Sequence, residues 1–442
     1  MPARNRRTAV PAPPPRLEGE TLLDRLCWWC ALAAIFILPV IVIPSAYDPY
    51  RTPKELILRA AGIVIAALFA IRCVLFGMPP VAWKRDRIYV FVIIVLAWTA
   101  LTAAVARHRV LAGYSLLFAA SAAAVFAAVY TYARTEERWL TAMHVILAAA
   151  AFNGVSCLAA RMSAGTNMFF AVLQNRSVGL LGSANDAGPY LALTVVAAAA
   201  MAVAVPARRW LYAVVAAFLA AALVTTATMG ALVALFVAAA VALFLVSRRN
   251  FAIAAAGLAL AAAIVVVAYA PLRARVKDFA HAASTGDLDA VLGGRATPFL
   301  AAIDMAKDRP LTGVGPGCFA YEYFPYKIAV EERHPSLVFA ATRMMNFGDV
   351  HNDHLQTLAQ TGLPGYALFL AALVLVGRCS LGARPGVDEA GPRFAHAAAM
   401  PFATVIAVAA LPEFIIELAA PAVTALALAA LCLVWRDRVA TA

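Results

Sequence analysis

The sequence predicts an all-α, polytopic membrane protein with about twelve transmembrane helices and one large outer loop. Of the 442 residues, 64% are hydrophobic and only 14% are charged, whereas about a quarter of the residues in a soluble domain are charged. Many windows supply the roughly twenty apolar residues that a spanning helix needs. The alternation of polar and apolar residues typical of an outer-membrane β-barrel is missing, so the spans are predicted to be helices.

Twelve apolar segments are predicted to cross the membrane. Alanine-rich stretches among them suit close helix packing in lipid, where small side chains let backbones approach. The expected spans are 22–43, 56–76, 88–106, 112–133, 139–160, 187–205, 210–227, 230–247, 251–270, 363–378, 394–412 and 415–435.

These spans divide the chain into four regions. Residues 1–21 resemble a signal peptide, but the long polar stretch with Pro13-Pro14-Pro15 favours a disordered cytoplasmic tail before an uncleaved first helix. Residues 22–270 are expected to hold helices one to nine. Residues 271–350 form the outer loop with short helices, and 351–442 hold a motif helix and the last three spans.

The basic residues predict the orientation of these helices. Six clusters fall on one side of the twelve-span topology, which is then the cytoplasmic side, so both termini are expected inside. The 271–350 loop lies outside, with nine basic and nine acidic residues, and the net charge of +12 belongs to the rest of the chain. This charge indicates topology and attraction to membrane lipids. No nucleic-acid-binding motif is present, and no nucleic-acid partner is expected.

The seven cysteines form no disulfide framework. Cys27-Trp28-Trp29-Cys30 has CxxC spacing, but it lies inside the first apolar segment and outside any βαβ pattern. Cys318 is the one cysteine of the outer loop, so no disulfide can close that loop on itself. The cysteines are interpreted as packing residues.

The run His351-Asn352-Asp353-His354-Leu355 contains the main candidate for catalysis. It ends a polar stretch and precedes the apolar segment that begins near Leu363. An imidazole where an outer loop re-enters the membrane can meet lipid-linked and water-soluble groups, and it titrates near neutral pH. His351 is therefore a candidate general base, although a capping or packing histidine is the alternative.

A metal site at the same run is a second alternative. His354, Asp349, Asp353 and His334 are close to His351 in sequence. The spacing is not that of a zincin helix, and no further ligand stands at a fixed offset. No metal and no cofactor are therefore predicted.

The outer face also collects basic side chains that could bind phosphate. Guanidinium groups match phosphate oxygens in a bidentate manner, whereas the alternative is that they solvate the surface or extend to lipid headgroups. The run Gly313 to Gly317 lacks the ending of a nucleotide P-loop and is either a connector or a weak phosphate signal. The basic residues include Arg51, Lys54, Arg107, Arg109, Arg161, Arg176, Arg295, Lys307 and Arg309, with Arg59 in reserve near the outer end of the second span.

Three motifs resemble a known family. His351-Asn352, followed by Gly362-Leu363-Pro364-Gly365, is similar to the His-Asn…Gly-x-x-Gly signature of the O-antigen ligase and polymerase superfamily. Arg295 followed by Pro310-Leu311-Thr312-Gly313-Val314-Gly315-Pro316-Gly317-Cys318-Phe319 resembles its loop motif. Arg176-Ser177-Val178-Gly179, with Asn185, resembles its Arg-x-x-Gly…Asn stretch. The resemblance covers about 160 to 380.

One position departs from the family pattern. Relatives commonly carry Ser-Arg-Gly where this chain has Thr228-Met229-Gly230. The expected arginine is Met229 here. Either another outer arginine, such as Arg161 or Arg176, supplies that charge, or the substrate contact differs.

The resemblance implies a metal-independent, inverting glycosyltransferase in a bacterial inner membrane, with its active site facing the periplasm. It implies undecaprenyl-pyrophosphate-linked glycan as donor and a lipid A–core sugar hydroxyl as acceptor. His351 and Arg295 are then expected to be catalytic, His351 as general base and Arg295 at the pyrophosphate. The expected substrate-binding residues are Arg176, Arg161, Lys54, Asn185 and Asn352.

Two other functions stay open. An O-antigen polymerase shares these motifs and differs in its acceptor. A transporter or flippase of lipid-linked glycans needs the same basic cavity, but it predicts polar or broken helices through the full membrane depth. In this chain polar residues concentrate on one face and the middles of the spans are almost bare of charge, which favours an enzyme.

Overall fold

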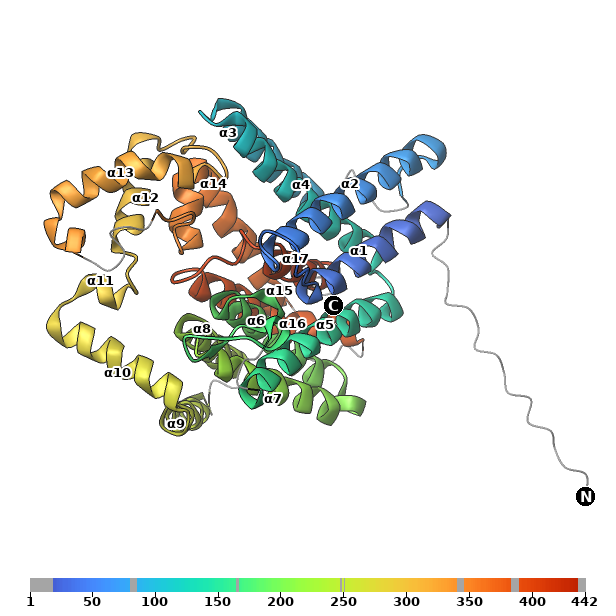
Figure 1. Cartoon of the computed structure of the whole chain (residues 1–442). Helices are drawn as coiled ribbons and strands as arrows, with labels where there is room; N and C mark the ends of the chain where they lie inside the picture. Colours follow the sequence, from blue (N-terminus) through green and yellow to red (C-terminus); the bar gives the residue numbers. More distant parts are fainter. Residues whose placement is uncertain are drawn as a thin grey trace, which may run out of the picture.

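The described part of the chain is almost entirely helical, as expected for an all-α polytopic membrane protein (Figure 1). The structure is a computed structural model that describes residues 19–79, 86–163, 167–246, 249, 251–339, 346–382 and 389–435. Most of the predicted N-terminal tail and residues 340–345 of the predicted outer loop lie outside these ranges. All seven cysteines are free thiols, which agrees with the absence of a disulfide framework.

A helix is present at each of the twelve predicted spans. Within the described ranges, ten helices are long and apolar enough to cross a membrane; α17 is shorter, and α16 is not among the ten. The twelve helices are α1 (Leu22–Val40), α2 (Arg51–Phe76), α3 (Arg87–Val105), α4 (Arg109–Tyr132), α5 (Glu136–Met162), α6 (Ala184–Ala204), α7 (Arg209–Thr226), α8 (Met229–Val246), α9 (Phe251–Ala268), α14 (Asp353–Gly377), α16 (Ala390–Ala409) and α17 (Ala419–Leu433).

The helix α6 lies at the centre of the bundle. Its most apolar window is 83% buried, whereas the corresponding window of α9 is 0% buried. It packs against α5, α7, α8, α16 and α17. Alanines such as Ala197 and Ala198 are fully buried, because small side chains let neighbouring helix backbones approach. The bundle therefore holds the first residues of α6 in a fixed position.

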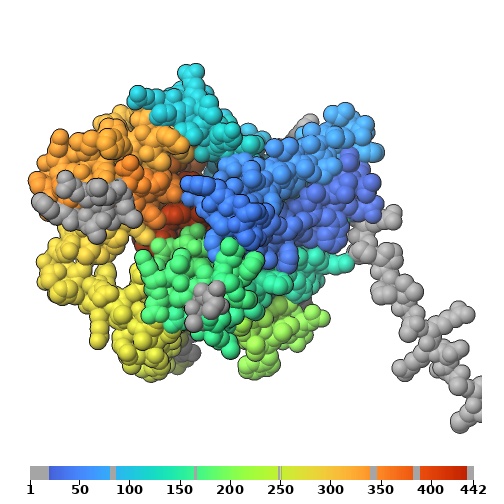
Figure 2. Space-filling view, viewed as in Figure 1, coloured from blue at the N-terminus to red at the C-terminus, as the bar shows by residue number. Residues whose placement is uncertain are grey.

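The segment between α9 and α14 forms a lobe beside the bundle (Figures 1 and 2). Here α12 packs on α13 and α14, and Phe319 and Tyr323 are fully buried in a second hydrophobic cluster. The elements of the lobe are α10 (Ala270–Thr285), α11 (Leu288–Val291), α12 (Ala296–Asp308), α13 (Phe319–Arg333) and the 3-10 helix η4 (Pro335–Phe339). Figure 2 shows an opening between the yellow atoms of this lobe and the green atoms of the bundle.

The glycine-rich run of the lobe is a structural connector. The amides of Val314 and Gly315 donate to the carbonyls of Ala359 and Gln360, so they are not free to hold a phosphate. The helix α14 breaks at Gly362, where φ is +69° and an added Cβ would lie 2.2 Å from the Leu311 carbonyl oxygen. This close approach of two backbones requires glycine. The predicted tenth span begins at this break, and the first turns of α14 lie before it.

Short elements between α5 and α6 were not predicted. The strands β1 (Val172–Leu173) and β2 (Arg176–Ser177) pair in an antiparallel hairpin. Gln174 and Asn175 both have positive φ, as the turn of a two-residue hairpin requires. The hairpin places Arg176 at the start of the second strand. The remaining short elements are η1 (Met168–Phe170), η2 (Gly179–Leu181), η3 (Pro206–Arg208) and α15 (Cys379–Gly382).

Candidate active site

The candidate active site lies where four connecting segments meet at one end of the bundle. These four segments precede α6, α8, α12 and α14. A fifth segment, the 410–418 connection between α16 and α17, contacts the residues that begin α12 and α14. Every segment is fixed by a helix that begins or ends beside it. The site is therefore built from parts of the chain that are far apart in sequence.

His351 is held in a strained conformation between two aromatic rings. Its φ is +59°, a left-handed value that is uncommon for a residue other than glycine and often marks a functional site. Its ring centroid lies 4.7 Å from that of Phe414 and 6.0 Å from that of Phe347. Its Nδ1 is buried with no hydrogen-bond partner among the described residues. A ring with an unused nitrogen, fixed in this way, can exchange a proton with a bound substrate.

The pKa of His351 is lowered to about 4. The main cause is burial, which disfavours the charged imidazolium, and the positive charge of Arg295 adds to it. The carboxylate of Asp349 opposes the shift. The imidazole is therefore neutral in the empty site at physiological pH, and it can accept a proton.

The residues after His351 tie α14 to the 410–418 connection. Asn352 caps α14 because its Oδ1 accepts from the Leu355 amide at 2.9 Å. Asp353 is fully buried, and its Oδ2 accepts from the amides of Ile415 and Ile416 at 2.6 and 3.2 Å. Asn352 was predicted to bind substrate, and in the structure its side chain positions the helix that follows His351.

Arg295 joins the lobe to the same connection. Its guanidinium donates to the Pro412 carbonyl, and its Nη2 lies 3.6 Å from Oε2 of Glu413. Burial raises the pKa of Glu413 to about 7, while the charge of Arg295 opposes that rise. Pro412 itself packs against Gly230, where an added Cβ would lie 2.3 Å from the proline ring. Arg295 and His351 thus both contact residues 412–414 of this connection.

Arg176 lies beside the turn that precedes Met229. Its Nε donates to the Thr226 carbonyl at 2.8 Å, and its Nη2 donates to Thr228 Oγ1 at 2.8 Å and to Asn185 Oδ1 at 2.5 Å. Burial lowers the pKa of Arg176 to about 10, so the group stays charged at physiological pH. A guanidinium is thus present beside the turn where the resembling family carries its arginine.

Sequence reasoning missed three charged residues: Arg275 and Glu413 lie near Arg176, and Glu417 lies near Asp349 and Gln356. Arg275 on α10 is exposed and lies within electrostatic range of both Arg176 and Glu413. Glu413 and Glu417 are buried acids in an otherwise apolar stretch, and burial raises the pKa of Glu417 to about 7. The signal was available, because an acid between two spans is a functional candidate by default.

A second polar network supports the loop before His351. Arg51 Nη1 lies 3.4 Å from Asp349 Oδ2 and its Nε lies 2.9 Å from Glu55 Oε1. Gln356 donates to Asp349 at 3.2 Å and accepts from the Val350 amide at 2.8 Å. The network fixes the backbone on the N-terminal side of the strained histidine.

Two predicted substrate-binding residues, Lys54 and Arg161, donate hydrogen bonds to backbone carbonyls. Lys54 is buried and its Nζ donates to the carbonyls of Ile41 and Leu180 at 2.6 and 3.0 Å. Arg161 donates to the Asn175 carbonyl at 3.2 Å and lies over the Tyr269 ring, 5.5 Å from its centroid. The structure brings Arg176, Arg295, Asn185 and His351 towards one site. Arg161 contacts the hairpin that carries Arg176, and Lys54 lines a small pocket with Arg51 and Asp186.

His354 has a packing environment. Its two ring nitrogens lie 3.2 Å from the Tyr366 hydroxyl and 2.9 Å from the Ala407 carbonyl oxygen. The described ranges contain no group of three His, Cys, Asp or Glu side chains that could hold a metal ion. His354 is therefore a matched structural control for His351.

The comparisons with known proteins agree with the motifs at this site. No curated protein matches the chain. Residues 214–370 match the family described as O-antigen ligase, and this range contains Arg275, Arg295 and His351. The chain is therefore a multi-pass membrane protein whose residues 214–370 match the O-antigen ligase family.

Proposed function

We propose that this protein is an O-antigen ligase of the bacterial inner membrane. It transfers a glycan from undecaprenyl pyrophosphate to a sugar hydroxyl of lipid A–core on the periplasmic face. The observation that carries the proposal is the strained, half-buried His351 within electrostatic range of Arg295. This arrangement combines a proton acceptor with a charge suited to a phosphate leaving group.

The arginines hold the leaving group. Pyrophosphate gains negative charge as the glycosidic C–O bond breaks, and guanidinium groups aimed at that position stabilise the charge. Arg295 comes from the lobe and Arg176 from the hairpin before α6, and Arg275 adds a third positive charge nearby. One carboxylate, that of Glu413, is paired with Arg295. The group therefore keeps an excess of positive charge for an anionic donor.

His351 activates the acceptor. The acceptor hydroxyl oxygen attacks the anomeric carbon, its proton moves to the imidazole, and undecaprenyl pyrophosphate leaves with the electron pair of the broken bond. The negative charge of the donor offsets the positive charge of Arg295. Donor binding therefore raises the pKa of His351 from about 4 and makes the imidazole a stronger base. A single displacement of this kind inverts the anomeric centre.

The glycan acceptor distinguishes this proposal from its alternatives. Purified protein in lipid nanodiscs is supplied with a lipid-pyrophosphate glycan and lipid A–core. We expect the glycan on lipid A–core. If the lipid-linked glycan is lengthened instead, the protein is an O-antigen polymerase. If the protein in liposomes moves the donor across the bilayer and forms no new glycosidic bond, it is a transporter.

A further inference from the structure

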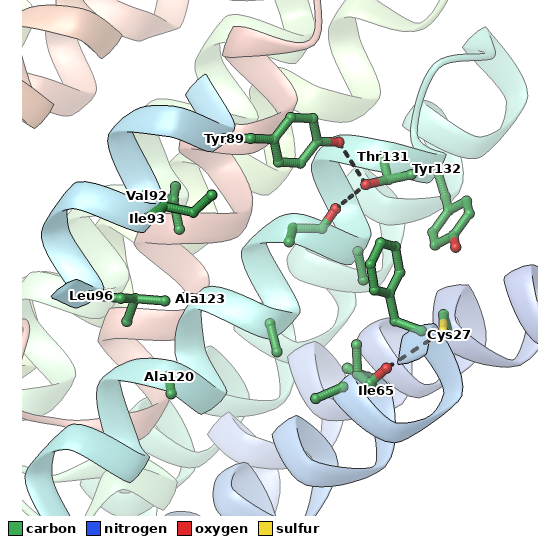
Figure 3. Close-up of a pocket in the computed structure, with 15 residues that line it drawn as sticks. Cys27, Ile65, Tyr89, Val92, Ile93, Leu96, Ala120, Ala123, Thr131 and Tyr132 are labelled. Atoms are coloured by element: carbon green, nitrogen blue, oxygen red, sulfur yellow. Dashed lines mark hydrogen bonds between the residues drawn. The ribbon is translucent and has the colours of Figure 1, made fainter. Parts of the chain in front are cut away.

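A cavity lies in the half of the bundle that is remote from His351. It has a volume of about 230 Å³ and is bounded by α2, α3 and α4, with Cys27 of α1 at one end (Figure 3). Its floor is one face of α4, formed by Ala120, Ala123, Ala124, Ala127 and Ala128. The helix α4 begins at Arg109 and ends at Tyr132, so this floor covers its middle and second half.

The cavity exists because two helices rest on one alanine face. Both α2 and α3 contact α4, and Figure 1 shows them extending from it in different directions. Alanine methyl groups are too short to fill the space that this divergence leaves. The side chains of Phe69, Val92 and Leu96 form the walls, and Ala66 and Ile93 at its rim are exposed.

The lining selects a hydrocarbon occupant. It is almost wholly apolar, and the hydroxyl of Tyr89 is already paired with Thr131 Oγ1 at 2.8 Å. Water needs two to four polar partners and would find too few here. An empty space would forfeit the dispersion contacts of its walls. Because α2, α3 and α4 are membrane-spanning helices, the surrounding medium is lipid.

Positive charge at the end of the cavity indicates the kind of lipid. Asp86 caps α3, accepts from the Tyr130 hydroxyl at 2.6 Å, and lies 3.8 Å from Arg134 Nη2. Tyr130 also contacts Tyr89 of the lining, with ring centroids 5.3 Å apart. Arg87 is exposed and follows Asp86 directly. Asp24, which accepts from the hydroxyl of Tyr132 in the lining, is paired with Arg72, so Arg87 and Arg134 stand against the carboxylate of Asp86 at this end.

We propose that the cavity is a binding site for an anionic phospholipid. One acyl chain lies on the alanine face of α4, and the phosphate lies near Arg87 and Arg134. Basic side chains at a membrane surface attract anionic headgroups. The occupant belongs to the leaflet opposite the His351 site, so this inference does not depend on the proposed reaction.

Photo-crosslinking of the full-length protein in nanodiscs tests the site. The probes are phosphatidylglycerol and phosphatidylethanolamine, each carrying a diazirine in one acyl chain, and the adducts are mapped by mass spectrometry. We expect phosphatidylglycerol adducts on the facing surfaces of α3 and α4. Arg87→Gln and Arg134→Gln should each lower the preference for phosphatidylglycerol roughly fivefold, since one arginine contributes about 1 kcal/mol near an anionic surface.

Larger side chains on the α4 face of the cavity provide a second, independent variant. Ala123→Phe with Ala127→Phe should remove the adducts at the cavity, whereas Ala97→Phe, at an exposed position of α3 outside the lining, should leave them unchanged. Adducts spread evenly over the outer faces of the helices would overturn the proposal. So would equal labelling by both phospholipids, or preferential labelling by a diazirine analogue of polyprenyl pyrophosphate.

Discussion

Oε2 of Glu413 lies 3.6 Å from Nη2 of Arg295, and both side chains are largely buried. Arg295 precedes α12 in the lobe, whereas Glu413 follows α16 of the bundle. Breaking a buried pair by removing one partner leaves an uncompensated charge. The pair therefore fixes both the position of the lobe and the direction of the guanidinium that is proposed to meet pyrophosphate.

Replacing Glu413 tests this positioning role. Glu413→Gln keeps the shape of the side chain and removes its charge, so Arg295 is expected to be held less firmly. A small displacement of a substrate-positioning group can cost up to about a hundredfold in rate, and we expect kcat to fall roughly tenfold or more. Glu417→Gln is the control, because Glu417 lies on the same connection and forms no ion pair with Arg295. Equal losses in both variants would argue for a general effect on the loop.

His351→Ala should abolish glycan transfer while leaving expression and donor binding largely intact. Loss of a general base typically lowers the rate about a hundredfold to ten-thousandfold. His354→Ala should cost far less, because His354 contacts Tyr366 and the Ala407 carbonyl. Steady-state transfer by the two purified variants checks this. Normal turnover of His351→Ala would refute the proposed mechanism.

The pH dependence of kcat/KM should show the lowered pKa of His351. The neutral imidazole is the active form, so transfer should fall as the pH drops through about 4 in the free enzyme. Arg295→Gln removes a like charge, which should raise that pKa and move the acid limb to higher pH. Burial should still keep the pKa of His351 below the ordinary value of about 6.5. An acid limb at the same pH in both proteins would contradict this electrostatic coupling.

Arg295→Ala and Arg176→Ala should each weaken transfer strongly, by about 3 kcal/mol or roughly a hundredfold. Lysine at either position should restore only part of the transfer rate, because a point charge cannot reproduce the bidentate hydrogen bonds of a guanidinium group. Met229→Arg should be neutral or harmful, since Arg176 already donates to Thr226 and Thr228 beside it. The measurement is the rate of glycan transfer by each variant. A sharp gain in Met229→Arg would mean that the site lacks positive charge.

Transfer should survive exhaustive treatment with EDTA. Charge stabilisation is assigned to guanidinium groups, so no divalent ion is required for the reaction. The measurement is glycan transfer before and after chelation, followed by addition of Mg²⁺ or Mn²⁺. Activity that disappears and then returns with the ion would give His351 and the neighbouring aspartates a role as ligands.

Gly362→Ala should destabilise the protein. The residue has φ +69°, and a Cβ would lie 2.2 Å from the Leu311 carbonyl oxygen. A left-handed conformation alone costs a non-glycine residue about 1–2 kcal/mol, and separating the two backbones adds to it. Gly257→Ala is the control, because that helical glycine has open space around it. Thermal unfolding in detergent should show a lower Tm for Gly362→Ala alone.

Much of the fold could be predicted because it depends on contiguous sequence. All twelve predicted segments contain a helix, since the length of an apolar run is a local property. The motifs around His351 and Arg295 were likewise recognisable in short windows. The hairpin before Arg176 was missed because a two-residue turn of Gln174 and Asn175 lacks the usual glycine signal.

The sequence by itself determined the membrane class, the helices and the candidate base. Only the tertiary structure decided which charges surround that base: Glu413 beside Arg295, Arg275 near Arg176, and Lys54 bound to backbone carbonyls in a pocket with Arg51 and Asp186. The physical reason is that hydrophobic length acts within one segment. A contact between residues more than a hundred positions apart depends on how small side chains let whole helices pack, and no single window of sequence contains that information.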